Sequence, residues 1–253
     1  MIENQGQKVA NFFDDIAQQY TQKYSSTHPI LIYFFNQRLK KATQNIDFKH
    51  KKILDIGAGT GTFYDYICTQ QTDFQYVACD ISNQMLHHSN IPEAQRFVGQ
   101  AFEIEWDSER FDLIYALGVT TYMTAADWQK TIIFLTEKID TDGKIIFSFT
   151  NKSSLDFKIR NVIKKILPKR HSKNVLHQDF EILAFEHHTL LAELSPYFKI
   201  EKTHWLNQTI SGLNRIFPKS SIAVGDYLLK KLNRFPNIMK YISSDFLLVI
   251  SKK

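Results

Sequence analysis

The chain has 253 residues, of which 43% are hydrophobic and 23% charged, with a formal net charge of +5. This size fits one α/β domain with additions. Two cysteines, Cys68 and Cys79, are too few for a disulfide framework, so we expect both to be reduced and packed. No apolar stretch reaches the roughly 18 residues that a membrane-spanning helix needs, and the N-terminal sequence lacks a basic region followed by an apolar core. We therefore expect neither export nor membrane spanning, and a cytoplasmic protein.

Two helical stretches precede the first predicted strand, at Gln7–Tyr20 and Pro29–Ala42. The second opens with proline, which is favoured in a first helical turn because its missing N–H would be unpaired there in any case. The first is amphipathic, since large apolar residues recur in it at helical spacing: Phe12, Phe13, Ile16 and Tyr20. We expect this helix to lie over the domain, either simply packed against it or acting as a lid.

A glycine-rich turn follows the first predicted strand. Residues 53–61 read I-L-D-I-G-A-G-T-G, and Gly57, Gly59 and Gly61 allow positive φ and close approach to a ligand. The spacing is G-x-G-x-G, which differs from the G-x-G-x-x-G of dinucleotide sites. Asp55, two residues before the first glycine, would repel a pyrophosphate and suits a ligand with an ammonium or sulfonium group. The turn therefore predicts a site for a cationic ligand.

This run closely resembles motif I of the class I S-adenosylmethionine-dependent methyltransferases, in particular those acting on small molecules. The resemblance covers roughly residues 45 to 150 and implies S-adenosylmethionine as the cofactor. It implies that the glycine turn surrounds the methionine end of that cofactor, and that residues 117–122, opened by Leu117, face the transferable methyl. It also implies that a tyrosine before the motif, Tyr20 or Tyr24, helps to close the site. The turn residues concerned are Asp55, Gly57, Ala58, Gly59 and Gly61.

The second predicted strand, at 75–79, ends in Asp80, which follows Gly59 by 21 positions. An acid at this place can accept hydrogen bonds from both ribose hydroxyls, and Ile81 after it would lie on the adenine face. Ser82 has a side chain that can cap the next predicted helix, Asn83–Ser89. The motif thus continues into the second strand as the family pattern implies.

A third predicted strand, at 95–98, leads to Gln100, Ala101 and Phe102. The family often has an acid in this loop, which accepts a hydrogen bond from the adenine amino group. This chain has Gln100, whose carbonyl oxygen can accept the same bond without charge assistance. We expect these three residues to line the adenine site.

Strand-like and helix-like segments alternate from Lys51 to Phe149, which predicts a parallel, doubly wound sheet with crossover helices. Further strands are predicted at 111–116, 143–149, 197–205 and 245–251. The family resemblance implies a Rossmann-like α/β fold with seven strands, the last antiparallel, plus N-terminal helices and a helical cap. We expect a single domain over residues 1–253, with an N-terminal helical lid (1–44), a cofactor-binding core (45–150), and substrate-cap insertions with the closing strands (151–253).

The basic residues concentrate in the C-terminal part of the chain. Residues 1–150 have 13 Lys or Arg against 18 acids, whereas residues 151–253 have 18 against 8. Within 153–173, apolar residues form one helical stripe with basic residues largely off it. Three interpretations remain open: a lid with a solvated basic face, peripheral contact with a membrane or acyl chain, and nucleic-acid binding. Nucleic acid is disfavoured, because no RNA-binding module is evident. The basic residues of this stretch are Lys158, Arg160, Lys164 and Lys165.

The chemistry implied is in-line methyl transfer to O or N of a small, partly hydrophobic molecule. Because the sulfonium already activates the methyl, alignment and exclusion of water matter most, and a catalytic base is optional. We assign no catalytic residue; the histidines that could act as a base are His177, His187, His188 and His204. No D-P-P-Y or N-P-P-Y run suggests methylation of a nucleic-acid base, and no residue cluster suggests a metal site.

Two other classes of protein remain open at this point. The first is a nicotinamide-dependent oxidoreductase, which also uses a glycine turn after its first strand. The second is a noncatalytic module that binds S-adenosylmethionine and associates with a membrane. Ligand binding separates the first from a methyltransferase, and product formation separates the second.

Overall fold

The computed structural model describes residues 4–20, 29–106, 110–166, 181–209 and 211–253. The predicted residues Tyr24 and His177 lie outside these ranges, as does the basic stretch beyond Ile166. The side chains of Lys164 and Lys165 are also outside the described part.

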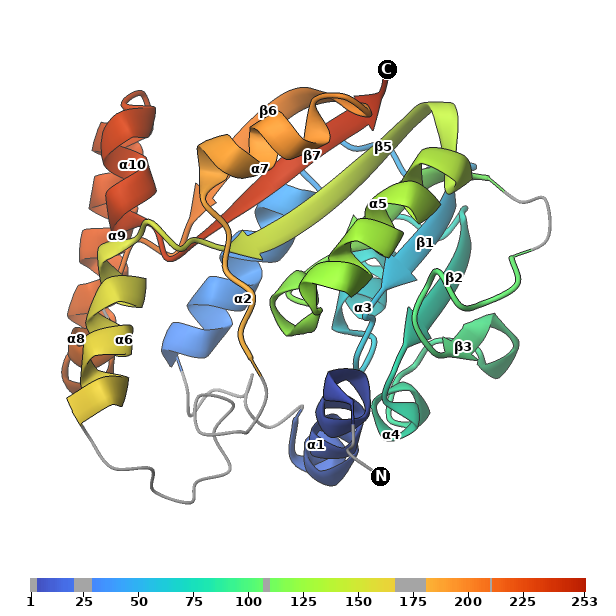
Figure 1. The fold of residues 1–253 in the computed structure, drawn as a ribbon, viewed down its shortest axis with the longest axis horizontal. Helices are drawn as coiled ribbons and strands as arrows, with labels where there is room; N and C mark the ends of the chain where they lie inside the picture. Colours follow the sequence, from blue (N-terminus) through green and yellow to red (C-terminus); the bar gives the residue numbers. More distant parts are fainter. Residues whose placement is uncertain (1–3, 21–28, 107–109, 167–180, 210) are drawn as a thin grey trace.

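Seven strands form one mixed sheet in the order β3-β2-β1-β4-β5-β7-β6 (Figure 1). β1 pairs in parallel with β2 and β4, and β7 pairs antiparallel with both β5 and β6. The predicted seven-stranded α/β sheet with an antiparallel last strand is therefore confirmed. The strands are β1 (Lys52–Ile56), β2 (Gln75–Asp80), β3 (Arg96–Val98), β4 (Phe111–Ala116), β5 (Ile139–Thr150), β6 (Phe198–Leu206) and β7 (Asp245–Lys252).

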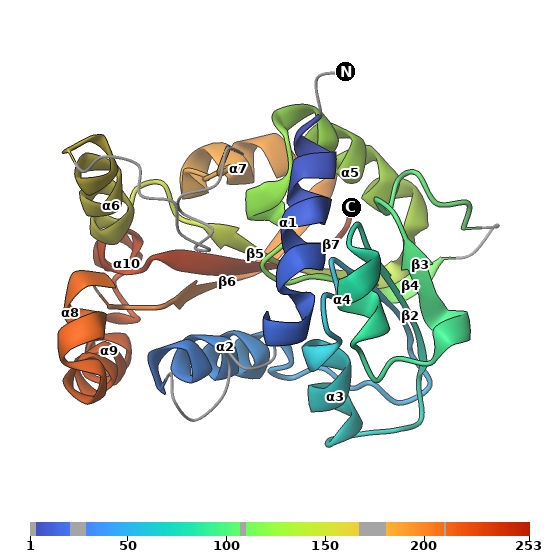
Figure 2. The ribbon, with the colours of Figure 1, turned by 90° about the horizontal axis from the view of Figure 1, so that it is seen from below.

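Helices cover both faces of the sheet (Figure 2). On one face, α2 and α3 pack through Leu39, Phe63 and Ile67. On the other, α5 and α7 pack through side chains that include Trp128 and Leu190. The helices are α1 (Gln5–Tyr20), α2 (Pro29–Ala42), α3 (Thr62–Cys68), α4 (Asn83–His87), α5 (Ala125–Lys138), α6 (Leu155–Ile166), α7 (His187–Leu194), α8 (Ser211–Ile216), α9 (Pro218–Leu232) and α10 (Pro236–Ile242).

Alternation along the strands divides the core into two layers. In β4, Leu113 and Tyr115 face α2 and α3, whereas Ile114 and Ala116 join the layer under α5. This is the period of two that a strand imposes on its side chains, and here both faces are apolar because both are covered. Both cysteines are free thiols, and Cys79 is buried in the core.

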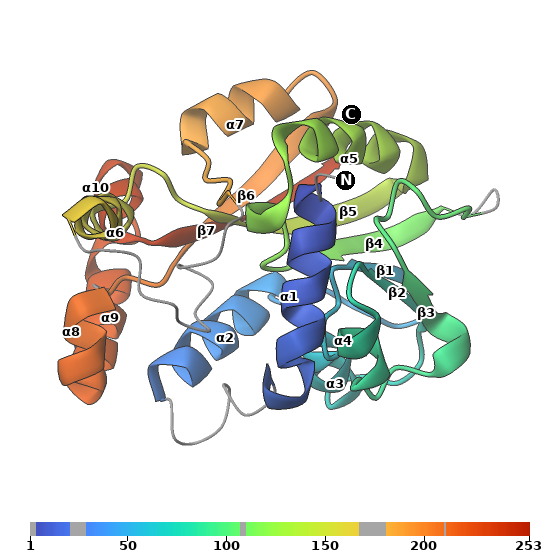
Figure 3. The same ribbon diagram turned by 60° about the horizontal axis from the view of Figure 1, so that its bottom comes forward.

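The first helix lies across the carboxyl ends of the parallel strands (Figure 3). Its apolar side, with Val9, Phe12 and Ile16, packs on Met85 of α4. The structure thus places the predicted amphipathic helix over the edge of the sheet where βα loops form sites in open α/β folds.

Helices α6, α8, α9 and α10 gather at one end of the molecule, beyond the end of β5 and the start of β7 (Figures 1 and 2). They lie within residues 151–253, where the cap insertions are predicted, and their role as a substrate cap stays a prediction. No helix in the described part of the chain is both long and apolar enough to cross a membrane. The same residues contain no group of three or more His, Cys, Asp or Glu that could hold a metal ion.

Candidate cofactor and acceptor site

The glycine turn needs its glycines for different physical reasons. Gly57 and Gly59 both have positive φ, 71° and 56°. A Cβ on Gly57 would lie 2.5 Å from a methyl carbon of Val119, so packing excludes a side chain there. A Cβ on Gly59 would meet no atom within 4 Å, because that side of the residue faces open space. The missing side chain of Gly59 therefore leaves space that a ligand can occupy, whereas the missing side chain of Gly57 leaves space for the side chain of Val119.

Gly61 is the left-handed residue that precedes α3, with a φ of 74°. A Cβ there would lie 2.9 Å from the Cβ of Ser89. Of the predicted cofactor residues, Gly61 alone lines neither of the two cavities described below. Its glycine is explained by the start of the helix and by close packing, and direct cofactor contact by Gly61 stays a prediction.

Asp80, at the end of β2, is held by two backbone amides. Gly59 N donates to Asp80 Oδ2 at 2.8 Å, and Ser82 N donates to Asp80 Oδ1 at 2.9 Å. Burial raises the pKa of Asp80 to about 6, although these two hydrogen bonds oppose the shift. Each carboxylate oxygen keeps a further lone pair. The geometry leaves Asp80 able to accept two hydrogen bonds from a ligand diol.

Ser82 caps α4 as predicted, accepting a hydrogen bond from Met85 N at 3.1 Å. The same hydroxyl donates to Asp14 Oδ1 of α1 at 2.6 Å, and Gln84 N donates to that oxygen at 2.9 Å. The first helix is thus tied to the start of α4 by a charged group as well as by apolar packing. A negative charge also suits the start of α4, because free N–H groups are found there.

Asp55 lies in β1 below the turn and is buried. Tyr76 Oη donates to its Oδ2 at 2.6 Å. Burial raises the pKa of Asp55 to about 7; the Tyr76 hydrogen bond opposes the rise, and the nearby charge of Asp80 adds to it. A cation bound beside Asp55 would favour the ionised carboxylate and lower this pKa.

The predicted adenine residues meet in a small cavity of about 60 Å³. Gly6 of α1 and Tyr122 of the loop after β4 also line it. Lys130 Nζ lies 5.2 Å from the ring centre of Phe102. The loop after β3 and the end of β2 thus form one apolar slot beneath the first helix. The predicted residues that line it are Asp80, Ile81, Gln100, Ala101 and Phe102.

A larger cavity of about 460 Å³ adjoins the glycine turn. Gly57 and Tyr122 line both cavities, so the two are neighbours. The remaining predicted residues line the larger one: Tyr20, Asp55, Gly57, Ala58, Gly59 and Leu117. A ligand with an apolar ring at one end and a charged group at the other would fit across the pair.

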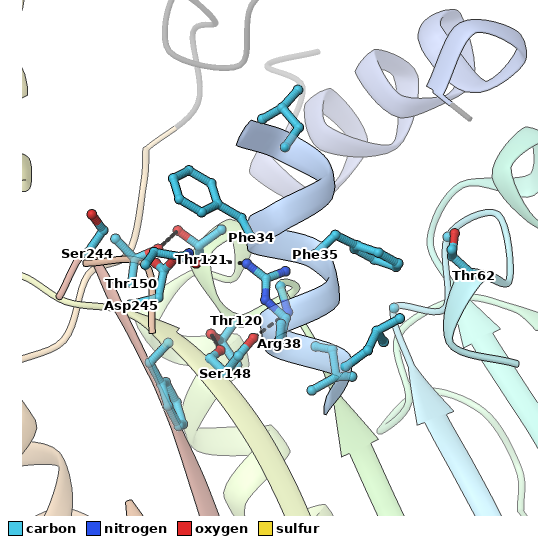
Figure 4. A pocket seen from close by; sticks show the side chains of 18 of the residues that line it. Phe34, Phe35, Arg38, Thr62, Thr120, Thr121, Ser148, Thr150, Ser244 and Asp245 are labelled. Carbon is cyan, nitrogen blue, oxygen red and sulfur yellow. Dashed lines mark hydrogen bonds and ion pairs between the residues drawn. The ribbon is translucent and has the colours of Figure 1, made fainter. Parts of the chain in front are cut away.

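The larger cavity extends beyond the predicted residues to side chains that the sequence did not indicate (Figure 4). Phe34, Phe35 and Arg38 come from α2, and Ser148 comes from β5. Ser148 Oγ accepts a hydrogen bond from Gly118 N at 2.7 Å and thereby fixes the loop after β4. Nothing in the sequence of α2 distinguishes Arg38 from its neighbours Lys40 and Lys41.

Asp245 also lines the larger cavity. Its place in the sequence, at the start of the predicted last strand, could have indicated this. It opens β7, and a strand that runs against its neighbours begins at the edge where they end. The antiparallel last strand, which was predicted, therefore brings its first residue to the site.

None of the described histidines lines either cavity. His187 Nε2 lies 3.1 Å from Thr203 Oγ1, and the ring packs on Trp205. His204 is buried in β6, and burial together with Lys202 and Lys41 lowers its pKa to about 4. His188 is exposed on α7. These positions do not favour a histidine base.

Comparison with known proteins supports the resemblance. Residues 54–145 match a family model described as a methyltransferase domain. No curated protein is detectably similar to the chain in sequence.

Solved structures share the whole fold at low sequence identity. A methyltransferase from Thermotoga maritima, described as a possible histamine N-methyltransferase, is 12% identical with a TM-score of 0.62, over 96% of this chain and 99% of its own. Magnesium protoporphyrin IX methyltransferase from Synechocystis, with bound S-adenosylhomocysteine, is 12% identical with a TM-score of 0.61, over 99% and 100%. A TehB-like methyltransferase from Corynebacterium glutamicum is 13% identical with a TM-score of 0.54, over 96% and 99%.

The doubly wound sheet that binds nicotinamide dinucleotides is mostly parallel, with the strand order 3-2-1-4-5-6. This sheet instead inserts the antiparallel β7 between β5 and β6. The domain match identifies residues 54–145 as a methyltransferase domain, and the seven-stranded sheet with its antiparallel last strand is the one that the resemblance to class I S-adenosylmethionine-dependent methyltransferases implies.

Proposed function

We propose that the chain transfers a methyl group from S-adenosylmethionine to O or N of a small, partly hydrophobic molecule. The observation that carries this proposal is the larger cavity, which continues past the glycine turn into a space lined by aromatic and polar side chains. The methyl donor supplies an activated carbon, so the protein has to align the acceptor and exclude water.

The cofactor residues of this proposal follow from the chemistry of the two cavities. Adenine would lie in the small slot beside Gln100 and Phe102, with the ribose hydroxyls on Asp80. The methionine end would lie in the larger cavity, where Asp55 faces its ammonium group. Gly59 supplies the space that lets the chain of the ligand pass the turn.

Arg38 joins this set as the group that binds the methionine carboxylate. A Cβ on Gly118 would lie only 2.6 Å from Arg38 Nη1, so the guanidinium lies directly against the loop after β4. Its only ion pair within the described chain, to Asp245 Oδ2, is 3.9 Å long, and its buried Nε has no partner there. A guanidinium with unused donors suits a carboxylate, which it can bind through two parallel hydrogen bonds.

The acceptor would occupy the rest of the larger cavity. Leu31, Phe34 and Phe35 of α2 provide an apolar wall, and Ser148 and Thr150 of β5 provide hydroxyl groups. Such a lining supports a molecule with both an apolar and a polar part. Two of the structural neighbours are named for small-molecule acceptors, histamine and magnesium protoporphyrin IX.

The domain organisation belongs to the same proposal. Residues 1–44 form a lid, since α1 covers the small slot through Gly6 and α2 lines the larger cavity. Residues 151–253 form the substrate cap and the closing strands, since Arg160 of α6 and Asn214 of α8 reach the same cavity. Residues 45–150 hold the cofactor.

A second observation favours peripheral contact of the cap with an anionic membrane. Residues 211–242 contain six Lys or Arg and one acid. The same helices expose large apolar side chains, with Ile216 68%, Phe217 59% and Tyr227 62% accessible. Apolar residues among cations are typical of interfacial helices. An anionic lipid surface is the partner that this combination suits.

Calorimetric titration with S-adenosylhomocysteine and with NADH tests the cofactor, and incubation with labelled S-adenosylmethionine and metabolite extracts tests the transfer. We expect S-adenosylhomocysteine to bind and NADH not to bind. Tight binding of NADH alone would overturn the proposal. Cofactor binding without methylated product across varied extracts would favour a noncatalytic module.

A further inference from the structure

Asp245 and Asp156 are the two acids that line the larger cavity away from the glycine turn, and Asp245 is the one considered for the acceptor. It is the first residue of β7, and Thr150 at the end of β5 is its partner in the sheet. Both residues, together with Ser244, line the cavity (Figure 4). The antiparallel direction of β7 therefore places a carboxylate at the same edge as the glycine turn.

The contacts of Asp245 leave one of its oxygens available. Asn207 Nδ2 donates a short hydrogen bond to Asp245 Oδ2, and the same oxygen forms the long ion pair with Arg38. Oδ1 accepts no hydrogen bond from the described residues. Burial raises the pKa of Asp245, whereas Arg38, the Asn207 hydrogen bond and Arg160 act in the opposite direction and Asp156 adds to the rise.

Asn207 is fixed so that its amide faces Asp245. Its φ is 59°, its N–H donates to Gln37 Oε1 at 2.7 Å, and its carbonyl accepts from Ser244 N at 3.1 Å. Its side-chain Oδ1 is buried and has no partner among the described residues, and the same is true of Asn214 Oδ1. Both asparagines line the cavity. These oxygens can only accept hydrogen bonds, so they suit a ligand that donates them.

The other charges in the cavity are balanced once the cofactor is bound. Asp156 is buried and pairs with Arg160 at 2.8 Å, and Ser244 Oγ donates to it at 3.3 Å. In the proposed function, Arg38 faces the methionine carboxylate and Asp55 faces the ammonium. Asp245 then keeps only the long ion pair with Arg38, and it lies next to the side-chain oxygen of Asn207, which has no donor among the described residues. The Asp245 side chain is 18% exposed, and a carboxylate so largely removed from water is costly unless a ligand compensates its charge.

We propose that the acceptor is an amine, bound as its ammonium form between Asp245 and the side-chain oxygen of Asn207, with its apolar part against Phe34. Before transfer the ammonium gives one proton to the carboxylate of Asp245, so that the free lone pair of the nitrogen attacks the methyl carbon as the carbon–sulfur bond of the cofactor breaks. This inference rests on the proposed function and narrows its choice between O and N. Asp245 acts here as a binding and specificity residue, since a hydrogen-bonded carboxylate selects a cationic donor over a neutral or anionic group of the same shape.

The experiment uses the full chain saturated with S-adenosylhomocysteine, and three probes that share a phenyl ring: 2-phenylethylamine, phenylacetamide and phenylacetate. Their affinities are measured by calorimetry for the parent, Asp245→Asn, Asp245→Glu and the control Asp226→Asn on α9. We expect the amine to bind about tenfold or more tightly than the other two probes. Asp245→Asn should remove this preference, Asp245→Glu should keep part of it, and Asp226→Asn should retain it fully.

Titration with S-adenosylhomocysteine first shows that each variant is folded and binds the cofactor. If the parent fails in that titration, the proposed function fails. If it binds but the amide or the acid binds as tightly as the amine, if the amine shows no saturable binding, or if Asp245→Asn keeps the amine preference, the amine assignment is wrong and the proposed function stands.

Discussion

The backbone N–H of Gly59 donates a 2.8 Å hydrogen bond to the carboxylate of Asp80, 21 positions along the chain. Gly59 lines the larger cavity and Asp80 lines the smaller one, so this bond lies where the two cavities meet. A ligand that spans both has to cross it. In the proposed function the ribose of the adenosyl ligand lies at that point, where its hydroxyl groups would donate to the acid and the missing side chain of the glycine would leave room for it.

Replacing Asp80 with alanine should weaken binding of S-adenosylhomocysteine by about 1 to 3 kcal/mol, because the ribose hydroxyls lose a charged acceptor. Adenosine should lose the same amount, since it has the same ribose. Calorimetry with both ligands measures this, and Asp73→Ala, a substitution of an exposed acid, is the control. Unchanged affinity in a folded Asp80→Ala variant would contradict the ribose role.

Replacing Gly57 with alanine should mainly lower the stability of the fold, whereas replacing Gly59 with alanine should mainly lower the cofactor affinity. Gly59→Ala introduces a side chain into open space, so it should cost about 1 to 2 kcal/mol of stability from its positive φ and reduce cofactor affinity further. Gly57→Ala brings a Cβ against Val119 and should destabilise the fold more. Urea unfolding and calorimetry on each variant separate the two effects. Equal losses of stability would show that Gly59 is also limited by packing.

Cofactor affinity should rise with pH between about 6 and 8. Burial raises the pKa of Asp55 from 3.8 to about 7, and that of Asp80 to about 6. A ligand ammonium requires ionised Asp55, so S-adenosylhomocysteine should bind about tenfold more weakly at pH 6 than at pH 8. Asp55→Asn should bind more weakly than the parent at pH 8 and show less dependence on pH. A parent affinity that does not change over this range would count against ion pairing at Asp55.

The contribution of Asp55 to the stability of the ligand-free protein should fall as pH rises, whereas the cofactor affinity should rise. The folded-state pKa of Asp55 lies above its unfolded value, so the folded protein favours the protonated carboxyl. Its contribution to stability is therefore complete below about pH 4 and is lost as pH rises through about 7. The difference in melting temperature between the parent and Asp55→Asn, followed from pH 5 to pH 8, isolates this contribution. The melting temperature of the parent should fall relative to that of Asp55→Asn as pH rises.

Arg38→Gln should weaken the binding of S-adenosylhomocysteine about tenfold or more and leave the binding of adenosine unchanged. The reason is that only the former has the carboxylate that the guanidinium would bind. Lys40→Gln on the exposed side of the same helix is the matched control. Equal effects on both ligands would mean that Arg38 supports the site by packing and not by binding the methionine end.

Local patterns predicted most of the residues that line the proposed cofactor half of the site. The glycine turn, Asp80 and the loop at Gln100 are each fixed by a strand end and by the residues next to it, so the sequence order carries the geometry. The fifth strand begins at Ile139, four residues before its predicted start, because Ile139 pairs with Phe111 across a register shift. The polar run after Ile139 had the composition of a loop. The helix predicted at 83–89 ends at His87.

The acceptor half depends on contacts that no local pattern contains. Arg38 and Asp245 are 207 positions apart in sequence and meet only because α2 lies across the end of β7. Asn207 is held in position by its left-handed backbone and by a hydrogen bond from its N–H to Gln37 of α2. Such pairings arise from the packing of elements distant in sequence, so composition and periodicity cannot indicate them.

If the cap meets anionic lipid, reversing its exposed charges should abolish sedimentation with vesicles that contain phosphatidylserine. The variant replaces four exposed basic residues of α9 and its end with glutamate: Lys219, Lys230, Lys231 and Arg234. Each cation near such a surface contributes about 1 kcal/mol, so the loss should be nearly complete and should be mimicked in the parent by high salt. A control variant reverses four exposed lysines outside the cap: Lys49, Lys199, Lys202 and Lys253. Because both variants remove the same total charge, sedimentation that falls equally in the two would assign the effect to net charge. A parent that stays in solution with these vesicles would exclude the membrane contact, while leaving the cofactor site and its tests untouched.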